Sequence, residues 1–357
     1  MQIGFRNGLF ESSVRIHRLL DADIVLTSRK SIGASYFETF SREELYRTLG
    51  DQRVESVSPI NWGLQLWRNP KDRSFKPILA LGFEPGIPFL IEEELRQTGG
   101  VYNFRDLNIP GRIIFDTLSR AEYGVAMDDI TSMRADALRT EIEGKEVRVK
   151  GLVRVGPSFG SDGIVLMSRE TFARAGKDKA YEVELGLVRL YDPHLAEQVA
   201  KDLGAGAPAN IRVQTKEQFI RAEKAYWMTT TAIGLIFNMG VILGIAGGIA
   251  TIFQVLAANI VEHRDEYATL EAMGYGSGYV NGVVAKQGLI LTVLGFFPGL
   301  AVAALLYDLL SSSTRLPIFM SWPLVAEIFI AVLAMNVVSG WLAVASTDRT
   351  DPAELLE

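Results

Sequence analysis

"AYWMTTTAIGLIFNMGVILGIAGGIATIFQVLAANIV", residues 225–261, contains no Asp, Glu, Lys or Arg. Residues 287–307 and 328–347 are two further runs without these charged residues. A helix needs roughly 20 apolar residues to cross a hydrocarbon layer about 30 Å thick, whereas helices of soluble proteins average about 11–12 residues. Three such runs in the C-terminal part of the chain therefore predict an α-helical transmembrane bundle.

Residues 21–224 have the mixed pattern of a soluble α+β domain. Short apolar or alternating runs predict strands. They lie at 21–28, 54–67, 76–85, 145–155, 163–168, 181–191 and 209–215. Ser41 before two glutamates, and Asp192 before Pro193, are start signals for helices between the strands. The fold class expected is an α+β domain followed by a transmembrane bundle in which three spans are visible.

The first apolar run is longer than one membrane crossing requires. As a single helix, 225–261 would measure about 55 Å at 1.5 Å per residue. We expect one helix from near Thr215 into the membrane, with one end projecting into water as a stalk. An uninterrupted helix of this length would serve as a rigid lever.

The first 20 residues raise a question of topology. Arg6, Glu11 and Arg15 prevent a membrane crossing there, and 1–20 has no continuous apolar core of a signal peptide. Three spans place the two ends of the bundle on opposite sides of the membrane. Either the soluble domain is cytosolic with an external tail, or a first span precedes Met1.

Several kinds of chemistry are excluded or weakly indicated. The chain has no cysteine, which excludes disulfides and thiol chemistry. Gly144-Lys145 and Gly176-Lys177 lack the upstream glycine of a phosphate-binding loop, so no ATP or Mg²⁺ site is expected on this chain. His17, His194 and His263 are far apart in sequence, and we interpret them as solvated surface residues instead of metal ligands.

Ser158 in "GPSFG" matches the G-x-S-x-G pattern of hydrolase nucleophile elbows. That motif needs a helix directly after the serine, and here "GSDGIVLM" predicts a turn and a strand instead. A glycine-rich turn is the favoured interpretation. A membrane-tethered serine hydrolase using Ser158 is the remote alternative.

Small residues are regularly spaced in the apolar runs. Gly240, Gly244 and Gly248 recur every fourth residue in the first run, and Gly295 and Gly299 repeat this spacing in the second. Such stripes let helix backbones approach closely in lipid. They predict helix-packing seams, and Asn238, Gln254 and Asn336 are expected to form polar contacts between helices.

The charged stretch "EHRDEYATLEAMGYGSGYV", residues 262–280, separates two apolar runs. Tyr267, Leu270 and Met273 fall on one side of a helical wheel, and Gly274 is a stop signal. A helix of about three turns is not stable alone in water. It therefore needs a partner surface: lipid headgroups or another protein.

Within this stretch, "EYATLEAMGYGSGYV" resembles the E-[IY]-x-x-L-[RK]-A-[ILM]-G motif of permeases of the MacB and FtsX superfamily of ABC transporters. The tail "RTDPAELLE" resembles their R-x-x-P-x-x-x-L ending. "GFRNGLFESSVRIHRLLDADIVLTS", "VESVSPINWGLQLWRNP", "ILALGFEP" and "VRVGPSFGSDGIVLMS" resemble the DevC branch found in cyanobacteria. The resemblance covers essentially the whole chain.

This resemblance implies a permease subunit without its own ATPase site. It would work as a homodimer in the inner membrane with a separate ABC ATPase, a periplasmic membrane-fusion adaptor and a TolC-like outer-membrane channel, and would export glycolipid or other envelope cargo. No nucleic-acid partner is expected. The motif residues that would couple the permease to the ATPase are Glu266, Tyr267, Leu270, Glu271, Ala272, Met273 and Gly274. Glu271 departs from the motif, in which many relatives have a basic residue.

The resemblance also assigns a side of the membrane to each segment. Relatives have four spans, so the expectation is a late start or a truncated gene, with 1–20 as the exit of a missing first helix. The expected segments are a periplasmic α+β domain at 21–224, a long membrane helix with stalk at 225–261, a cytoplasmic coupling loop at 262–286, membrane helices at 287–307 and 322–347, and a cytoplasmic tail at 348–357. An FtsX-like mechanical signaller and a lipoprotein-releasing permease share the motif and are the alternatives.

Overall fold

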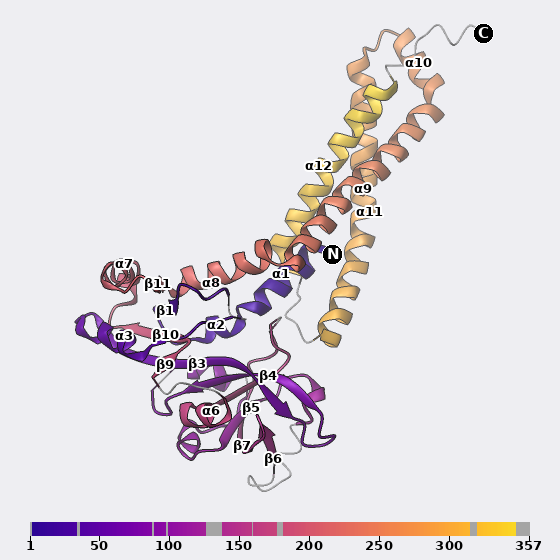
Figure 1. Cartoon of the computed structure of the whole chain (residues 1–357). Helices are drawn as coiled ribbons and strands as arrows, with labels where there is room; N and C mark the ends of the chain where they lie inside the picture. Colours follow the sequence, from indigo (N-terminus) through magenta and orange to yellow (C-terminus); the bar gives the residue numbers. More distant parts are fainter. Residues whose placement is uncertain are drawn as a thin grey trace. The chain divides into compact units, whose positions relative to one another are not determined.

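The computed structural model of the chain contains two compact units (Figure 1). It describes residues 2–33, 36–87, 89–97, 99–125, 138–158, 160–176, 181–314 and 320–347. The soluble unit comprises residues 9–231, and the membrane unit comprises residues 2–8, 232–314 and 320–347, within these described ranges. Helix α1 (Gln2–Ser13) contributes residues to both units.

The soluble unit is a mixed α/β structure. Its strands are β1 (Ile24–Ser28), β2 (Phe40–Ser41), β3 (Val54–Arg68), β4 (Phe75–Phe83), β5 (Arg112–Asp116), β6 (Arg139–Ile142), β7 (Lys145–Val153), β8 (Ile164–Ser168), β9 (Glu182–Val183), β10 (Leu185–Leu190) and β11 (Ile211–Thr215). Its helices are α2 (Arg15–Leu19), α3 (Arg42–Arg47), α4 (Glu92–Gln97), α6 (Arg169–Ala175), α7 (Ala196–Gly206) and α8 (Lys216–Ala225). Shorter 3-10 turns are η1 (Thr48–Gly50), η2 (Phe104–Asn108), η3 (Ala121–Tyr123) and η4 (Pro193–Leu195).

One large sheet organises this unit, with strand order β11-β1-β10-β3-β4-β8-β5-β7-β6. Strand β6 also pairs with the far end of β3, where Trp67 lies opposite Ile142. The strands from β3 to β6 therefore close into a small barrel. The long strand β3 belongs both to this barrel and to the open part of the sheet, because its first half pairs with β10.

A split βαβ arrangement forms the open part of the sheet. Strands β10 and β11 both pair antiparallel with β1, which lies between them, and α7 makes the connection. The predicted cap signals are present: the Ser41 side chain accepts the N–H of Glu43, and Asp192 accepts the N–H of His194. Thr215 and Gln218 form a reciprocal capping box at the start of α8.

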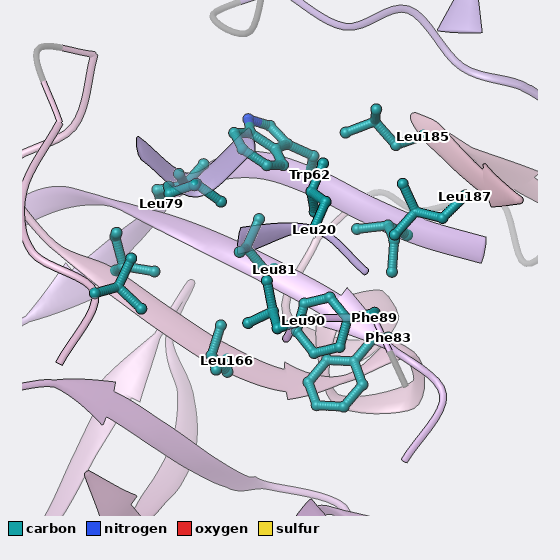
Figure 2. Close-up of a cluster of buried hydrophobic side chains, with 14 of the residues drawn as sticks. Leu20, Trp62, Leu79, Leu81, Phe83, Phe89, Leu90, Leu166, Leu185 and Leu187 are labelled. Carbon is teal, nitrogen blue, oxygen red and sulfur yellow. The ribbon is translucent and has the colours of Figure 1, made fainter. Parts of the chain in front are cut away.

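Two apolar cores hold the barrel and its surroundings together. Figure 2 shows the first, in which Trp62, Leu81 and Leu166 from neighbouring strands pack near Leu20. There the rings of Phe83 and Phe89 stack with their centroids 4.0 Å apart. The second core contains Trp67, which is fully buried. Its indole N–H donates to the carbonyl of Tyr123 at 3.1 Å, as a buried tryptophan requires.

A buried carboxylate fixes the segment after β7. Asp116 accepts the backbone N–H groups of Val155 and Gly156, each at 2.9 Å, and that of Leu118 at 3.2 Å. Burial raises the pKa of Asp116 to about 6, although these hydrogen bonds and the nearby Arg15 oppose the shift. This carboxylate holds the chain that leads into the turn at Ser158.

The membrane unit contains three helices long and apolar enough to cross a membrane. They are α9 (Ala232–Glu262), α11 (Ser277–Thr314) and α12 (Trp322–Thr347), and the shorter α10 (Arg264–Ala272) lies between α9 and α11 (Figure 1). The candidate spans are Ala232–Glu262, Gly282–Ser311 and Trp322–Ala345. Together with the mixed sheet of the soluble unit, these helices confirm the predicted fold class.

The helix expected to run without interruption from Thr215 into the membrane is broken. Residues Tyr226–Thr230 form a π-helical turn, η5, and Thr231 has an extended backbone with φ −92° and ψ 149°. The hydroxyl groups of Thr229 and Thr231 donate to the carbonyls of Ala225 and Trp227, each at 2.7 Å. Such back-bonding by threonine bends helices. The prediction of a continuous rigid lever is therefore wrong at this junction.

Candidate functional site

Helix α10 is a short element with defined ends. His263 separates it from α9, and its backbone carbonyl accepts the N–H of Tyr267 at 3.1 Å. At the other end Gly274 has φ +93°, and the N–H of Tyr275 donates to the carbonyl of Leu270 at 3.1 Å. This is the Schellman arrangement, which favours glycine at the left-handed position. The predicted stop at Gly274 is thus the observed helix end.

Tyr267 attaches α10 to the membrane helices. Its half-buried ring packs against an apolar cluster of Leu256 and Ile260 from α9, Val284 from α11 and Ala343 from α12. Its hydroxyl lies 3.5 Å from the side-chain oxygen of Gln287 on α11. One residue of α10 therefore contacts the apolar cluster to which all three long helices contribute.

Exposed apolar side chains lie just after the C-terminal end of α10. Met273 is 69% exposed, and Tyr275 and Tyr279 are also exposed, with their ring centroids 4.7 Å apart. We call these three residues the α10 patch. Glu266, Ala272 and Gly274 are exposed and Leu270 is half-buried, whereas the side chain of Glu271 lies outside the described structure. The predicted motif residues therefore divide into an anchor, Tyr267, and a mostly exposed remainder.

The charge around the α10 patch is acidic. Residues 262–274 contain four acidic residues and one arginine. Asp265 and Glu266 lie in the first turn of α10, where the helix dipole favours negative charge. An exposed apolar patch bordered by acidic groups is suited to a protein surface with an apolar pocket and basic residues.

The five glycines predicted to pack helices have different surroundings. A side chain added at Gly240 would meet Gln2, and one at Gly248 would meet the sulfur of Met335 on α12 at 3.0 Å. At Gly244, Gly295 and Gly299 an added Cβ would meet no described atom within 4 Å. The described contacts therefore use Gly240 and Gly248, and the other three glycines face open space within this chain.

Polar side chains join the long helices. Asn336 on α12 donates to the carbonyl of Gly288 and to the hydroxyl of Thr292 on α11, each at 2.5 Å. Ser339 on α12 donates to the carbonyl of Ile249 on α9 at 2.9 Å. Asn238 on α9 accepts a hydrogen bond from Arg6 at 3.1 Å. Asn238 and Asn336 thus make the predicted contacts between helices.

Gly288 provides a specific test of this packing. A Cβ at residue 288 would lie 2.4 Å from the Asn336 side-chain oxygen, so Gly288→Ala would displace the buried amide. We expect a loss of about 0.5–2 kcal/mol in bundle stability, the range spanned by double-mutant cycles and model peptides for interhelical hydrogen bonds in membranes. The measurement is unfolding of the detergent-solubilised chain by a denaturing detergent. Gly244→Ala, where an added Cβ would meet no described atom within 4 Å, is the control and should unfold like the unchanged protein. Equal destabilisation by both variants would contradict this account of the packing.

The comparison with protein families identifies the segment that contains these helices. Residues 238–352 match the family described as FtsX-like permease C-terminal. This FtsX-like segment includes most of α9 and all of α10, α11 and α12. The arginine, proline and leucine of the predicted tail motif, Arg349, Pro352 and Leu356, lie outside the described residues.

Solved structures similar to the chain include an extracellular domain and a periplasmic region of other proteins. The crystal structure of the extracellular domain of the noncanonic ABC-type transporter YknZ from Gram-positive bacteria aligns at 11% identity and a TM-score of 0.38, covering 54% of this chain and 100% of that one. The periplasmic region of MacB from Actinobacillus actinomycetemcomitans aligns at 10% identity and a TM-score of 0.37, covering 57% of this chain and 94% of that one. No curated protein sequence matches the chain.

The soluble unit, which is not part of the FtsX-like segment, contains the remaining predicted candidate, Ser158. Backbone hydrogen bonds between Ser158 and Ser161 form a turn, and strand β8 begins at Ile164. This position does not have the helix that a nucleophile elbow needs. The interpretation as a turn therefore fits the structure, and the hydrolase alternative gains no support.

The predicted exposure of the histidines is wrong for one of them. His194 is exposed, whereas His17 is only 1% exposed and its ring lies between those of Trp62 and Phe219, at 5.4 and 5.0 Å. Burial lowers the pKa of His17 to about 3. In the part of the chain that the structure describes, no group of three His, Asp or Glu side chains is arranged to hold a metal ion.

Proposed function

We propose that this chain is the membrane-spanning permease subunit of an ABC transporter of the MacB and FtsX superfamily, and that a separate ATPase subunit docks on helix α10. The match of residues 238–352 to the FtsX-like permease family supports the superfamily. The observation that carries the docking proposal is that the exposed, acid-bordered α10 patch directly follows a short helix whose half-buried Tyr267 packs against the membrane helices.

The proposed mechanism converts closure of the ATPase into movement of the long helices. A partner that binds the α10 patch pushes α10, and Tyr267 passes this force to the cluster shared by α9, α11 and α12. In the chain, α8 and η5 of the soluble unit come directly before α9. Movement therefore reaches that unit through the bent junction at 226–231, which acts as a joint and not as part of a rigid rod.

We also propose the finer features that the family resemblance implies. The ATPase would dock on α10 in the cytoplasm. Because a membrane crossing by α9 would place residue 231 on the opposite side from α10, the soluble unit would be periplasmic. The chain would form a homodimer, for which the open faces of Gly295 and Gly299 offer close helix contact in lipid. A periplasmic adaptor, a TolC-like channel and an envelope lipid such as a glycolipid would complete a transporter of the DevC type.

Purification of the chain from its native membrane in a mild detergent tests this function. We expect an ABC ATPase subunit to co-purify with it, and the complex in lipid vesicles to hydrolyse Mg-ATP faster than the isolated ATPase does. Co-purification of the adaptor and channel would support the finer assignment. A chain that purifies without any ATPase, under conditions in which its membrane helices stay folded, would contradict the proposal.

A further inference from the structure

A cavity of about 190 Å³ lies wholly within the soluble unit. Its walls come from segments far apart in the sequence: the α1–α2 region, the middle of β3, the turn around Ser158, and α8 with η5. The volume is about that of six molecules of liquid water, at roughly 30 Å³ each. This space admits one small compact group and is too small for a lipid chain.

Aromatic side chains form much of the wall. The tyrosine, phenylalanine and tryptophan residues that line the cavity are Tyr36, Phe37, Trp62 and Trp227. The rings of Phe37 and Trp62 stand edge to face, with centroids 5.6 Å apart and an interplanar angle of 83°, so their surfaces meet nearly at right angles. Trp62 is buried, and Phe37 and Trp227 are half-buried. The face of an aromatic ring carries negative potential and attracts a cation.

The charge of the wall has the same sign as the ring faces. Among the described residues that line the cavity, Glu223 is the only aspartate, glutamate, lysine or arginine. It is 3% exposed and accepts the indole N–H of Trp227 at 2.7 Å, which places the carboxylate beside one of the rings. His17 also lines the cavity, but burial lowers its pKa to about 3 and keeps the ring uncharged at neutral pH. The wall therefore favours a cation.

The polar groups of the wall are already engaged within the protein. The carboxylate of Glu223 accepts from Trp227, and the Ser161 hydroxyl donates to the carbonyl of Gly163 at 2.6 Å. The backbone N–H of Ser158 donates to the carbonyl of Ser161 at 2.9 Å. An occupant with several N–H or O–H groups would compete with these bonds. A quaternary ammonium has no N–H to donate, and aromatic rings are its usual partners in proteins.

We infer that this cavity binds a trimethylammonium group, the cationic group of choline and of phosphatidylcholine. The methyl groups pack on the rings of Phe37 and Trp62, and the carboxylate of Glu223 balances the charge. The inference does not depend on the proposed function, because every described residue of the wall belongs to the soluble unit.

Binding of choline to the full-length chain tests the inference. The chain is solubilised in a maltoside detergent, which contains no quaternary ammonium, and the ionic strength is held constant. The matched probe is the neutral analogue of choline in which a tert-butyl group replaces trimethylammonium. Tryptophan fluorescence reports occupancy, since Trp62 and Trp227 line the cavity. We expect saturable binding of choline and at least tenfold weaker binding of the neutral analogue, the equivalent of about 1.4 kcal/mol.

A further probe separates the two sources of the trimethylammonium group. Glycerophosphocholine is the water-soluble headgroup of phosphatidylcholine, and glycerophosphoglycerol is its control without the cation. Binding of glycerophosphocholine at least as tight as that of choline assigns the cavity to a lipid headgroup. Weaker binding of glycerophosphocholine assigns it to the free cation. Both results agree with the inference, whereas equal binding of glycerophosphoglycerol and glycerophosphocholine contradicts it.

Glu223→Gln keeps the size of the side chain and removes its charge. It should weaken choline binding at least tenfold, whereas Glu217→Gln, at an exposed position of the same helix α8, should leave binding unchanged. If Glu223→Gln does not fold, Phe37→Leu decides: it keeps an apolar side chain without the ring and should weaken choline binding severalfold. The inference is overturned if choline does not bind or if the neutral analogue binds as tightly. It is also overturned if neither Phe37→Leu nor a folded Glu223→Gln weakens choline binding.

Discussion

If the proposed function holds, the double substitution Leu270→Asp/Met273→Asp abolishes ATP-driven transport while leaving the chain folded. Met273 is exposed and Leu270 is half-buried on the same side of α10. Two carboxylates there would place charge at the apolar centre of the proposed contact and add to a segment that is already acidic. Loss of central contacts typically costs 2 kcal/mol or more each, so we expect at least about a hundredfold weaker docking of the ATPase.

Ala268→Asp is the matched control for this substitution. Ala268 is exposed on α10 but falls on the other side of the helical wheel from Leu270 and Met273. It should retain transport and ATPase docking close to those of the unchanged protein. Binding of the ATPase subunit to the detergent-solubilised permease gives the first readout, and transport in vesicles the second. Full ATP-driven transport by the double variant would refute docking on this face.

The second large effect expected is acid sensitivity caused by His17. Burial lowers the pKa of His17 from 6.5 to about 3, so below pH 6.5 the unfolded chain binds a proton there and the folded chain does not. The contribution of His17 to stability is full above pH 6.5 and falls as the pH decreases towards 3, by on the order of 5 kcal/mol. Asp116 acts in the opposite direction.

Burial raises the pKa of Asp116 from 3.8 to about 6. The folded chain therefore gains a proton at Asp116 before the unfolded chain does, and this group stabilises the fold by about 2 kcal/mol as the pH falls from 6 to 4. Between pH 6 and pH 4 His17 lowers the stability by about 2.5 kcal/mol, so the two effects nearly cancel and the stability of the unchanged protein should change little. His17→Phe should instead become more stable over the same interval.

Hydrogen exchange of β3 in the full-length chain, measured between pH 7 and pH 4 and corrected for intrinsic exchange, checks this expectation. His194→Phe is the control, because His194 is exposed, and it should follow the unchanged protein. Parallel pH profiles for the unchanged protein and His17→Phe would show that His17 is not the source of the acid sensitivity.

Local patterns in the sequence predicted much of the fold. The predicted strand runs correspond to β1, β3, β4, β7, β8, β10 and β11, because alternation and β-branched residues are local signals. The apolar helices were also predicted, because a run of about 20 residues without charged side chains is sufficient to indicate a membrane span. Closure of the barrel by β6 was not predicted. It depends on the pairing of Trp67 with Ile142, which lie far apart in the sequence.

Two predictions were wrong, the continuous helix through 226–231 and the exposure of His17, and they failed for different reasons. At the break in 226–231 the hydroxyl groups of Thr229 and Thr231 bond back to the helix backbone, a property that an apolar count does not register. The burial of His17 depends on Trp62 and Phe219, which belong to β3 and α8. No local signal around His17 indicates either neighbour. The burial of His17 was therefore missed, whereas α10 was predicted from its own residues.

Site-specific cross-linking tests the central claim, that α10 is the docking site of an ATPase, most directly. Because the chain has no cysteine, Met273→Cys introduces a single thiol at the α10 patch. A thiol-reactive photo-crosslinker attached there should join the permease to the ATPase subunit in native membranes, with a yield that changes when ATP is added. The same reagent at Ala268→Cys should give little product. No ATPase adduct from Met273→Cys, or equal yields from both positions, would contradict the account.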